Sequence, residues 1–441
     1  MSITKYQVNI SKNYLLKLAI PVFFSNLATP FVGIIDTALM GHLENVKFLA
    51  AASISTAVIT LIFWTFGFLR MGTVGLVSQA LGKGDYREIV LITMRNLSIG
   101  LFIGILIFSF KNPILSTIKY FFVTSPETFT LIKEYISIRL FSAPAELIIY
   151  VLIGFYLGLQ KTLISSILII TFSILNILFS IYFVIFLNLN IEGVALGTTL
   201  SSYITSIIFL IFTYYFIINN FKVIPRFKNI FRKKKIIKLF NINFNIFIRT
   251  ILLTFSFLWI NFKSSQLGED YLAVNAILMQ FVMLSSFFLD SYAFSTEGVI
   301  GFLIGRKKEK SFLKTVKISF ELSFLTSILI AVLYVVFFKL IVNSITNLEY
   351  TRFLTYGFIF WIVILPPIAS FCYQFDGIFI GASETAAMRN AMIISVASFV
   401  VLSIFLIDYF GNHGLWFSLI LFMVIRSLTL YFYFPKILKK F

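Results

Sequence analysis

Long hydrophobic runs separated by short polar segments fill the chain from end to end. We distinguish twelve runs, each long enough to cross a bilayer as a helix, because about 20 apolar residues span its hydrocarbon core. They cover residues 15–41, 50–80, 88–110, 126–158, 162–187, 191–218, 239–265, 271–303, 311–340, 348–382, 386–408 and 414–437. This pattern predicts an all-α integral membrane protein with twelve transmembrane helices.

The twelve predicted helices form two similar halves. When the chain is displaced by 223 residues, glycines and prolines coincide in the pairs Gly75 and Gly298, Gly82 and Gly305, Pro144 and Pro367, Gly154 and Gly377, and Gly158 and Gly381. Glycine makes up only 22 of the 441 residues, so this register indicates an internal duplication. Since each half has an even number of helices, the two six-helix lobes should be parallel. We expect lobes at 1–218 and 241–441, joined by a basic cytoplasmic linker at 219–240.

Charged residues orient the predicted helices. If the N-terminus lies inside, the inner loops contain most of the cations, and the outer loops contain mostly acids such as Glu127 and Glu349. The positive-inside rule then places both termini in the cytoplasm of a multi-pass protein of the inner (plasma) membrane. The inner linker contains a basic cluster, which we expect to anchor it on anionic lipid rather than to form a partner site. This cluster consists of Arg232, Lys233, Lys234 and Lys235.

Composition excludes several classes of function. The chain is 59% hydrophobic and only 12% charged, which is too few charges for a soluble protein. Its net charge of +18 is explained by the cytoplasmic loops, so we expect no nucleic-acid partner, and we expect a monomer. One cysteine and two distant histidines provide no metal site and no catalytic cluster, so the protein is not expected to be an enzyme. Without a phosphate-binding loop, transport must use an ion gradient or be passive.

A single carboxylate, Asp36, lies inside the first hydrophobic run, and Pro30 before it should bend that helix. A buried carboxylate in a membrane is costly unless it faces a cavity, a partner or an ion. Counted from the outer helix ends, Asp36, Ser180 and Thr198 fall at similar depth, and Asn176 lies somewhat deeper. These four residues could enclose one small cation. Alternatively, the Asn, Ser and Thr side chains only form hydrogen bonds between helices.

Other intramembrane charges predict a substrate path. Its candidate residues are Arg70, Asp290, Glu297 and Asp376. Asp290 and Asp376 have no obvious partner nearby in the sequence, and we expect them to attract cations. Arg70 and Arg249 are expected to pair with acids or carbonyls. In the register of the duplication Asp36 coincides with Trp259, so the charged positions differ between the lobes.

Several stretches resemble the multidrug and toxin extrusion (MATE) family, and within it the DinF-like branch. They are IIDTALMGHL (34–43), FLRMGTVGLVSQALGKGD (68–85), NILFSIYF (176–183), EGVALGTT (192–199), FLDSYAFSTEGVIG (288–301) and FDGIFIGASETAAMRN (375–390). The resemblance implies a twelve-helix, two-lobe antiporter that exports small organic, often cationic, compounds in exchange for inward protons or sodium ions, with no cofactor.

The resemblance also implies that Asp36, Asn176 and Thr198 belong to the family's cation site. Ser180 departs from the pattern, since the family usually has an acid there. A site with one carboxylate holds bare sodium less well, which favours a proton on Asp36. Apart from a possible sodium ion at Asp36, we expect no bound metal. Ser291 is a second departure, at a position where this branch commonly has Gly.

One alternative is a flippase for lipid-linked precursors, from the same broad superfamily. Such a protein needs a groove lined with cations for a diphosphate headgroup, whereas the intramembrane charges here are mostly acidic. The substrate itself is not predicted by the sequence.

Overall fold

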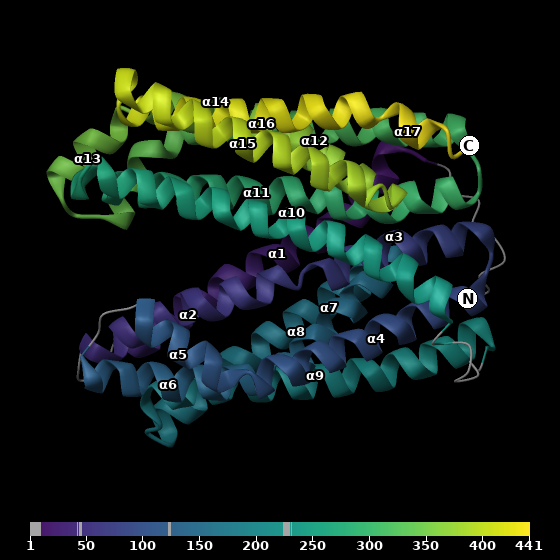
Figure 1. Cartoon of the computed structure of the whole chain (residues 1–441), viewed down its shortest axis with the longest axis horizontal. Coiled ribbons are helices and arrows are strands. Elements are labelled where there is room, and N and C mark those ends of the chain that lie inside the picture. The colour runs from purple at the N-terminus through teal and green to yellow at the C-terminus, as the bar shows by residue number, and fades with distance from the viewer. Residues whose placement is uncertain (1–9, 42, 44–45, 122–124, 224–229, 231) are drawn as a thin grey trace. The chain divides into compact units, whose positions relative to one another are not determined.

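The computed structural model describes residues 10–41, 43, 46–121, 125–223, 230 and 232–441, and this part of the chain is helical without strands (Figure 1). Eleven helices are long and apolar enough to cross a membrane, and a bent pair raises the number to twelve. The predicted all-α membrane architecture is therefore confirmed.

The helices of the first half follow the predicted spans closely. They are α1 (Lys12–Gly41), α2 (Val46–Thr65), α3 (Phe68–Lys83), α4 (Tyr86–Ser109), α5 (Lys111–Phe121), α6 (Pro126–Phe141), α7 (Ala143–Gly158), α8 (Thr162–Ile181), the π-helical turn η2 (Tyr182–Phe186) and α9 (Asn190–Phe221). The short helix α5 was not among the predicted spans. α1 is one helix through Pro30.

The second half repeats this order with longer helices. They are α10 (Lys233–Gln266), α11 (Glu269–Gly305), α12 (Glu309–Ile345), α13 (Glu349–Tyr356), α14 (Ile359–Ala382), α15 (Thr385–Phe410), α16 (Asn412–Tyr433) and α17 (Pro435–Leu438). Because α10 begins at Lys233, the part of the predicted linker from that residue onward is helical. Three of the four residues of the predicted basic cluster thus open a helix rather than lie in a loop.

Three predicted spans are broken in the structure, at 50–80, 126–158 and 348–382. The break between α6 and α7 bends the helix pair by 47°. Its cause is local: Pro144 has no N–H to donate to the carbonyl of Leu140. Ser142 ends α6 at this point, and its hydroxyl donates to the carbonyl of Arg139 at 2.7 Å.

The helices group into two compact units. The first comprises Phe24–Phe240, and the second comprises Asn241–Phe441 together with α1 as far as Phe23. The start of α1 is held in the second unit by an ion pair of 2.9 Å between Lys12 Nζ and Glu321 Oε2. The ring of Phe23 lies 4.6 Å from that of Phe288. The second unit resumes at Asn241, where the predicted second lobe begins, but the predicted linker at 219–240 belongs to the first unit and α1 contributes to both units.

The two units repeat the same helix packing in the register of the duplication. A Cβ on Gly154 of α7 would lie 2.5 Å from the carbonyl oxygen of Arg70 on α3. A Cβ on Gly377 of α14 would lie 2.6 Å from that of Ala293 on α11. Both pairs are related by the displacement of 223 residues. The predicted duplication is thus present as a backbone contact that only glycine permits in each unit.

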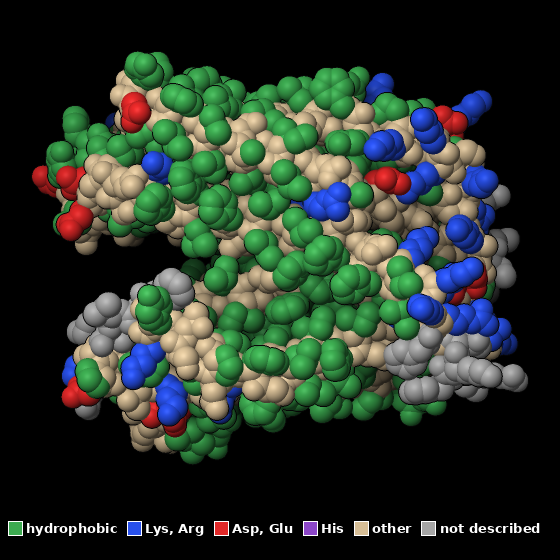
Figure 2. Space-filling model, viewed as in Figure 1, with side chains coloured by type: hydrophobic (Ala, Val, Ile, Leu, Met, Phe, Trp, Pro, Cys, Tyr) green, Lys and Arg blue, Asp and Glu red, His purple; other side chains and the backbone are tan. Residues whose placement is uncertain are grey.

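Charge is distributed unevenly along the second unit. Over α10 to α17, most of the visible Lys and Arg side chains lie at the end where the C-terminus is found, and the visible side chains at the opposite end include several acids (Figure 2). This separation of charge agrees with the asymmetry that the positive-inside rule uses.

Candidate functional site

The predicted carboxylate of the first unit, Asp36, is partly buried. Asp36 lies near the end of α1, and its Oδ1 is buried without a hydrogen-bond partner among the described residues. Ser180 of α8 faces this carboxylate, although its Oγ does not reach regular hydrogen-bond geometry. The structure therefore brings Asp36 and Ser180 together, as their depth in the sequence predicted.

The other two predicted residues are in contact with each other. Asn176 of α8 donates from Nδ2 to Thr198 Oγ1 at 2.8 Å, and Thr198 of α9 donates to the carbonyl of Val194 at 3.1 Å. Asn176 lies one helical turn before Ser180 on the same face. Within the described part of the chain, Asn176 Oδ1 and Ser180 Oγ are buried without partners, like Asp36 Oδ1. These oxygens can accept a proton donor, a water or a small cation.

Close packing of α9 on α8 explains how these residues meet. A Cβ on Gly197 would lie 2.6 Å from the backbone nitrogen of Ser180. With glycine there, the backbones approach closely enough for Thr198 to reach Asn176. Directly after Ser180, the helix widens into the π-helical turn η2, a feature that is often found at functional sites.

Sequence reasoning missed the charge that accompanies Asp36. The positive guanidinium of Arg139 on α6 lies near enough to attract the Asp36 carboxylate electrostatically. Arg139 Nη1 also donates to Glu146 Oε1 at 2.6 Å and to Ser142 Oγ at 2.7 Å, across the bend between α6 and α7. The sequence did contain a hint of the contact between Arg139 and Glu146. The two residues lie seven positions apart on either side of a helix break beside Pro144, and such a break can bring them together.

The second unit contains a buried ion cluster of its own. Asp376 Oδ2 on α14 contacts Arg249 of α10 and Arg426 of α16. The partners of Asp376 thus come from distant parts of the chain, where the sequence did not reveal them, and the expectation that Arg249 pairs with an acid is confirmed. Asp290 of α11 lies near enough to act on Arg426 and on Tyr373 of α14. Two arginines surround Asp376, so this acid is neutralised within the unit.

The two remaining predicted path residues, Glu297 and Arg70, are also buried. Glu297 of α11 is 1% exposed, and its carbonyl oxygen faces Gly381 of α14. Arg70 of α3 is 9% exposed in the other unit. The structure thus places Arg70 in the first unit and the other three path residues in the second, where Asp376 and Asp290 both act on Arg426.

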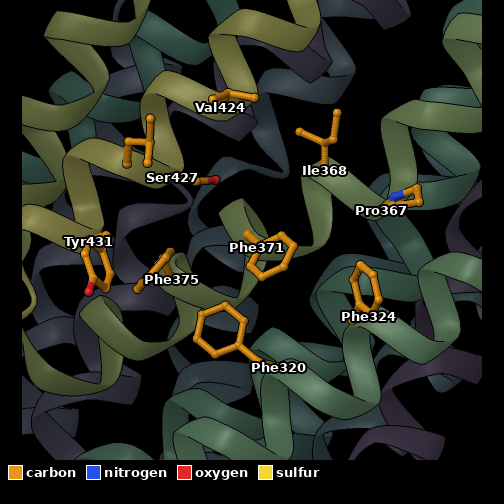
Figure 3. Close-up of a pocket in the computed structure, with 10 residues that line it drawn as sticks. Phe320, Phe324, Pro367, Ile368, Phe371, Phe375, Val424, Ser427 and Tyr431 are labelled. Atoms are coloured by element: carbon orange, nitrogen blue, oxygen red, sulfur yellow. The ribbon is translucent and has the colours of Figure 1, made fainter.

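An aromatic cavity of about 620 Å³, open at the surface, lies between α12, α14 and α16 of the second unit, and several of its lining side chains are exposed. Phe320 and Phe324 come from α12, Phe371 and Phe375 from α14, and Tyr431 from α16 (Figure 3). Its lining is almost wholly apolar, so it suits a flat hydrophobic group. Among the described residues, no group of three or more His, Cys, Asp or Glu could hold a metal ion.

Comparisons with known proteins identify what the chain resembles. The MatE family model matches residues 21–182 and again residues 246–407, which agrees with the duplication. DNA damage-inducible protein F of Escherichia coli (strain K12) is 31% identical over 417 residues, covering 94% of this chain and 90% of that protein. Multidrug export protein MepA of Staphylococcus aureus (strain bovine RF122 / ET3-1) is 23% identical over 311 residues, covering 69% of this chain and 68% of that protein.

The fold is also that of solved transporters. A structure described as the outward-facing conformation of a multidrug resistance MATE family transporter of the MOP superfamily superposes with a TM-score of 0.88. It is 17% identical and covers 97% of this chain and 96% of that chain.

Proposed function

The chain belongs to the MatE family, and we propose that it is a secondary antiporter that exports small organic, cationic or amphipathic compounds in exchange for inward protons. The observation behind this proposal is the partly buried carboxylate of Asp36 on a membrane-spanning helix. Relatives described as multidrug export proteins favour export over the flipping of lipid-linked precursors. We further propose that the protein lies in the inner membrane as a monomer with both termini in the cytoplasm.

Protons suit the Asp36 site better than sodium ions. A bare sodium ion needs several hard oxygen ligands. Here Ser180 stands where a second acid would be, so the site has a single carboxylate. A proton needs only one carboxylate oxygen, and Asp36 Oδ1 has no hydrogen-bond partner among the described residues.

The proton gradient can drive export through this group. One positive charge that moves inward gains about 2.3 kcal/mol per 100 mV, but a monovalent cation that leaves for each proton cancels this electrical gain, and the pH gradient then drives the exchange. This energy drives export only if proton and substrate favour different arrangements of the protein. A charged Asp36 requires polar surroundings, whereas a protonated Asp36 does not, so α1 can repack about Pro30 when the proton binds. That repacking would narrow the first unit and release the substrate.

The aromatic cavity of the second unit supports an amphipathic substrate. Flat organic cations bind to aromatic rings through stacking and through attraction of the charge to the ring face. Four Phe rings and Tyr431 offer such faces. Because Asp376 is neutralised by two arginines, this part of the proposal does not use it to attract cations.

Proteoliposomes that contain Asp36→Asn test the proposal. When ethidium is added outside, wild-type protein should exchange it for protons from the lumen, so the pH of the lumen should rise. The variant should fold but show no ethidium-driven proton movement. Asp408→Asn is the matched control, because Asp408 is an exposed acid on α15. Coupled flux near the wild-type rate in Asp36→Asn would contradict the proposal. Flux driven by a sodium gradient at constant pH would contradict proton coupling alone.

A further inference from the structure

A small polar cavity lies where α3 ends and α4 begins, beside the start of α10, all within the first unit. It consists of two adjoining hollows of about 130 Å³ and 140 Å³, which share Asp85, Glu88, Arg95 and Lys235. The cations that line the two hollows are Lys83, Arg87, Arg95, Arg232, Lys235 and Lys238. This cavity contains none of the residues of the Asp36 site.

Both acids of the cavity already have partners. Asp85 caps α4, since its Oδ1 accepts from the backbone N–H of Glu88 at 2.9 Å. Glu88 Oε1 accepts from Arg95 Nη1 at 3.0 Å and lies 3.1 Å from Lys235 Nζ. The charged residues that line the two hollows are thus six cations and two acids.

The cavity is a built site rather than a solvated basic face. Arg95 is 4% exposed, and its Nε donates to the carbonyl of Ile230 at 2.7 Å. Its guanidinium is thus fixed, and the exposed lysines Lys83 and Lys238 line the same cavity. A fixed guanidinium with surrounding ammonium groups matches the donors that bind phosphate oxygens.

We propose that this cavity binds a phosphate group, carried either by an anionic lipid headgroup or by a free phosphate ion. Basic pockets between membrane-spanning helices on the cytoplasmic side bind such headgroups. A bound phosphate would reinforce the link between α4 and the start of α10 that Glu88 and Lys235 make, because both helices contribute donors. The proposal is independent of proton coupling at Asp36.

Thermal unfolding of the purified full-length chain in neutral detergent tests the proposal. A ligand that binds only the folded protein raises its unfolding temperature. Two titrations separate the sources: phosphatidylglycerol compared with phosphatidylcholine, and sodium phosphate compared with sodium chloride at equal ionic strength. For Lys83→Gln/Lys238→Gln, the ligand concentration at half-maximal stabilisation should rise about tenfold or more.

Two matched variants serve as controls. Lys83→Arg/Lys238→Arg keeps both charges and should respond like wild type. Lys310→Gln/Lys314→Gln removes two exposed lysines from α12 of the second unit and should also respond like wild type. A response to phosphatidylglycerol alone assigns the site to lipid, and a response to phosphate assigns it to the free ion. The proposal is overturned if neither ligand stabilises wild type, or if the Gln variant of the cavity responds like the α12 control.

Discussion

Trp259 of α10 donates a hydrogen bond of 2.9 Å from its indole Nε1 to Ser403 Oγ of α15. These residues stand 223 positions after Asp36 and Ser180, which face each other in the first unit. The same pair of positions is therefore in contact in both units, but an indole replaces the carboxylate in the second. The duplicated scaffold has kept the contact and has placed the ionisable group in one unit only.

We predict that Ser403→Ala lowers stability without affecting coupling. The substitution leaves the indole N–H of Trp259 without its acceptor, which costs about 1–3 kcal/mol. The unfolding temperature should fall, while ethidium-driven proton movement per folded molecule stays near the wild-type value. Ser180→Ala is the counterpart in the first unit and should reduce proton movement instead. Equal effects of both substitutions on proton movement would contradict the assignment of coupling to Ser180 and of a structural role to Ser403.

A second carboxylate should give the Asp36 site affinity for sodium. Ser180→Asp places an acid beside Asp36, and two carboxylates with Asn176 and Thr198 offer the oxygen ligands that sodium prefers. We expect sodium chloride, compared with choline chloride, to raise the unfolding temperature of this variant but not that of wild type. Ser180→Asn, which has similar size and no charge, should remain insensitive to sodium. If sodium stabilised wild type to the same extent, the proposal that Ser180 weakens sodium binding at Asp36 would be wrong.

The repeated glycine contacts should be equally intolerant of a methyl group. In Gly154→Ala and Gly377→Ala the added Cβ would lie 2.5 Å and 2.6 Å from a backbone oxygen, and overpacking of this kind costs about 1–3 kcal/mol. Gly33→Ala is the control, because no atom lies within 4 Å of its added Cβ. Both buried variants should unfold at lower temperature than wild type, and Gly33→Ala should not. Wild-type stability of either buried variant would contradict the packing described for that unit.

Removal of Asp376 should destabilise the second unit more than it changes substrate preference. Asp376→Asn leaves Arg249 and Arg426 buried without the carboxylate between them, and loss of one partner from a buried ion cluster costs about 3–5 kcal/mol. The folded yield and unfolding temperature should fall. Adding Arg249→Met to Asp376→Asn should recover part of the loss, because one buried charge is removed. A double variant less stable than Asp376→Asn would show that the two residues do not act as a pair.

The sequence predicted the helices and the duplication because both depend on local patterns. Hydrophobic runs determine which segments enter a membrane, and the glycines that recur in one register include those that permit close helix contact. The approach of Asp36 to Ser180 followed from depth along two helices, which the rise per residue determines. The break at Ser142 also had a local signal in Pro144, although the predicted span ignored it.

The ion pairs could not be predicted in the same way. The cluster around Asp376 requires α10, α14 and α16 to present one side chain each toward a common point. Which face each helix presents depends on packing against several neighbours and not on its own sequence. For the same reason the action of Arg139 on Asp36 was missed, since α1 and α6 are far apart in the chain.

The assignment of α1 to both units has a consequence for the history of the chain. The helix is continuous, yet its first turns up to Phe23 belong with the second unit and the rest with the first. A gene fission in the segment before α10 would yield a second fragment without Lys12, the ion-pair partner of Glu321. That fragment would have to recover its missing turns from the other polypeptide. The compact second unit therefore includes residues from both ends of the chain, and we expect the second fragment alone to be incomplete.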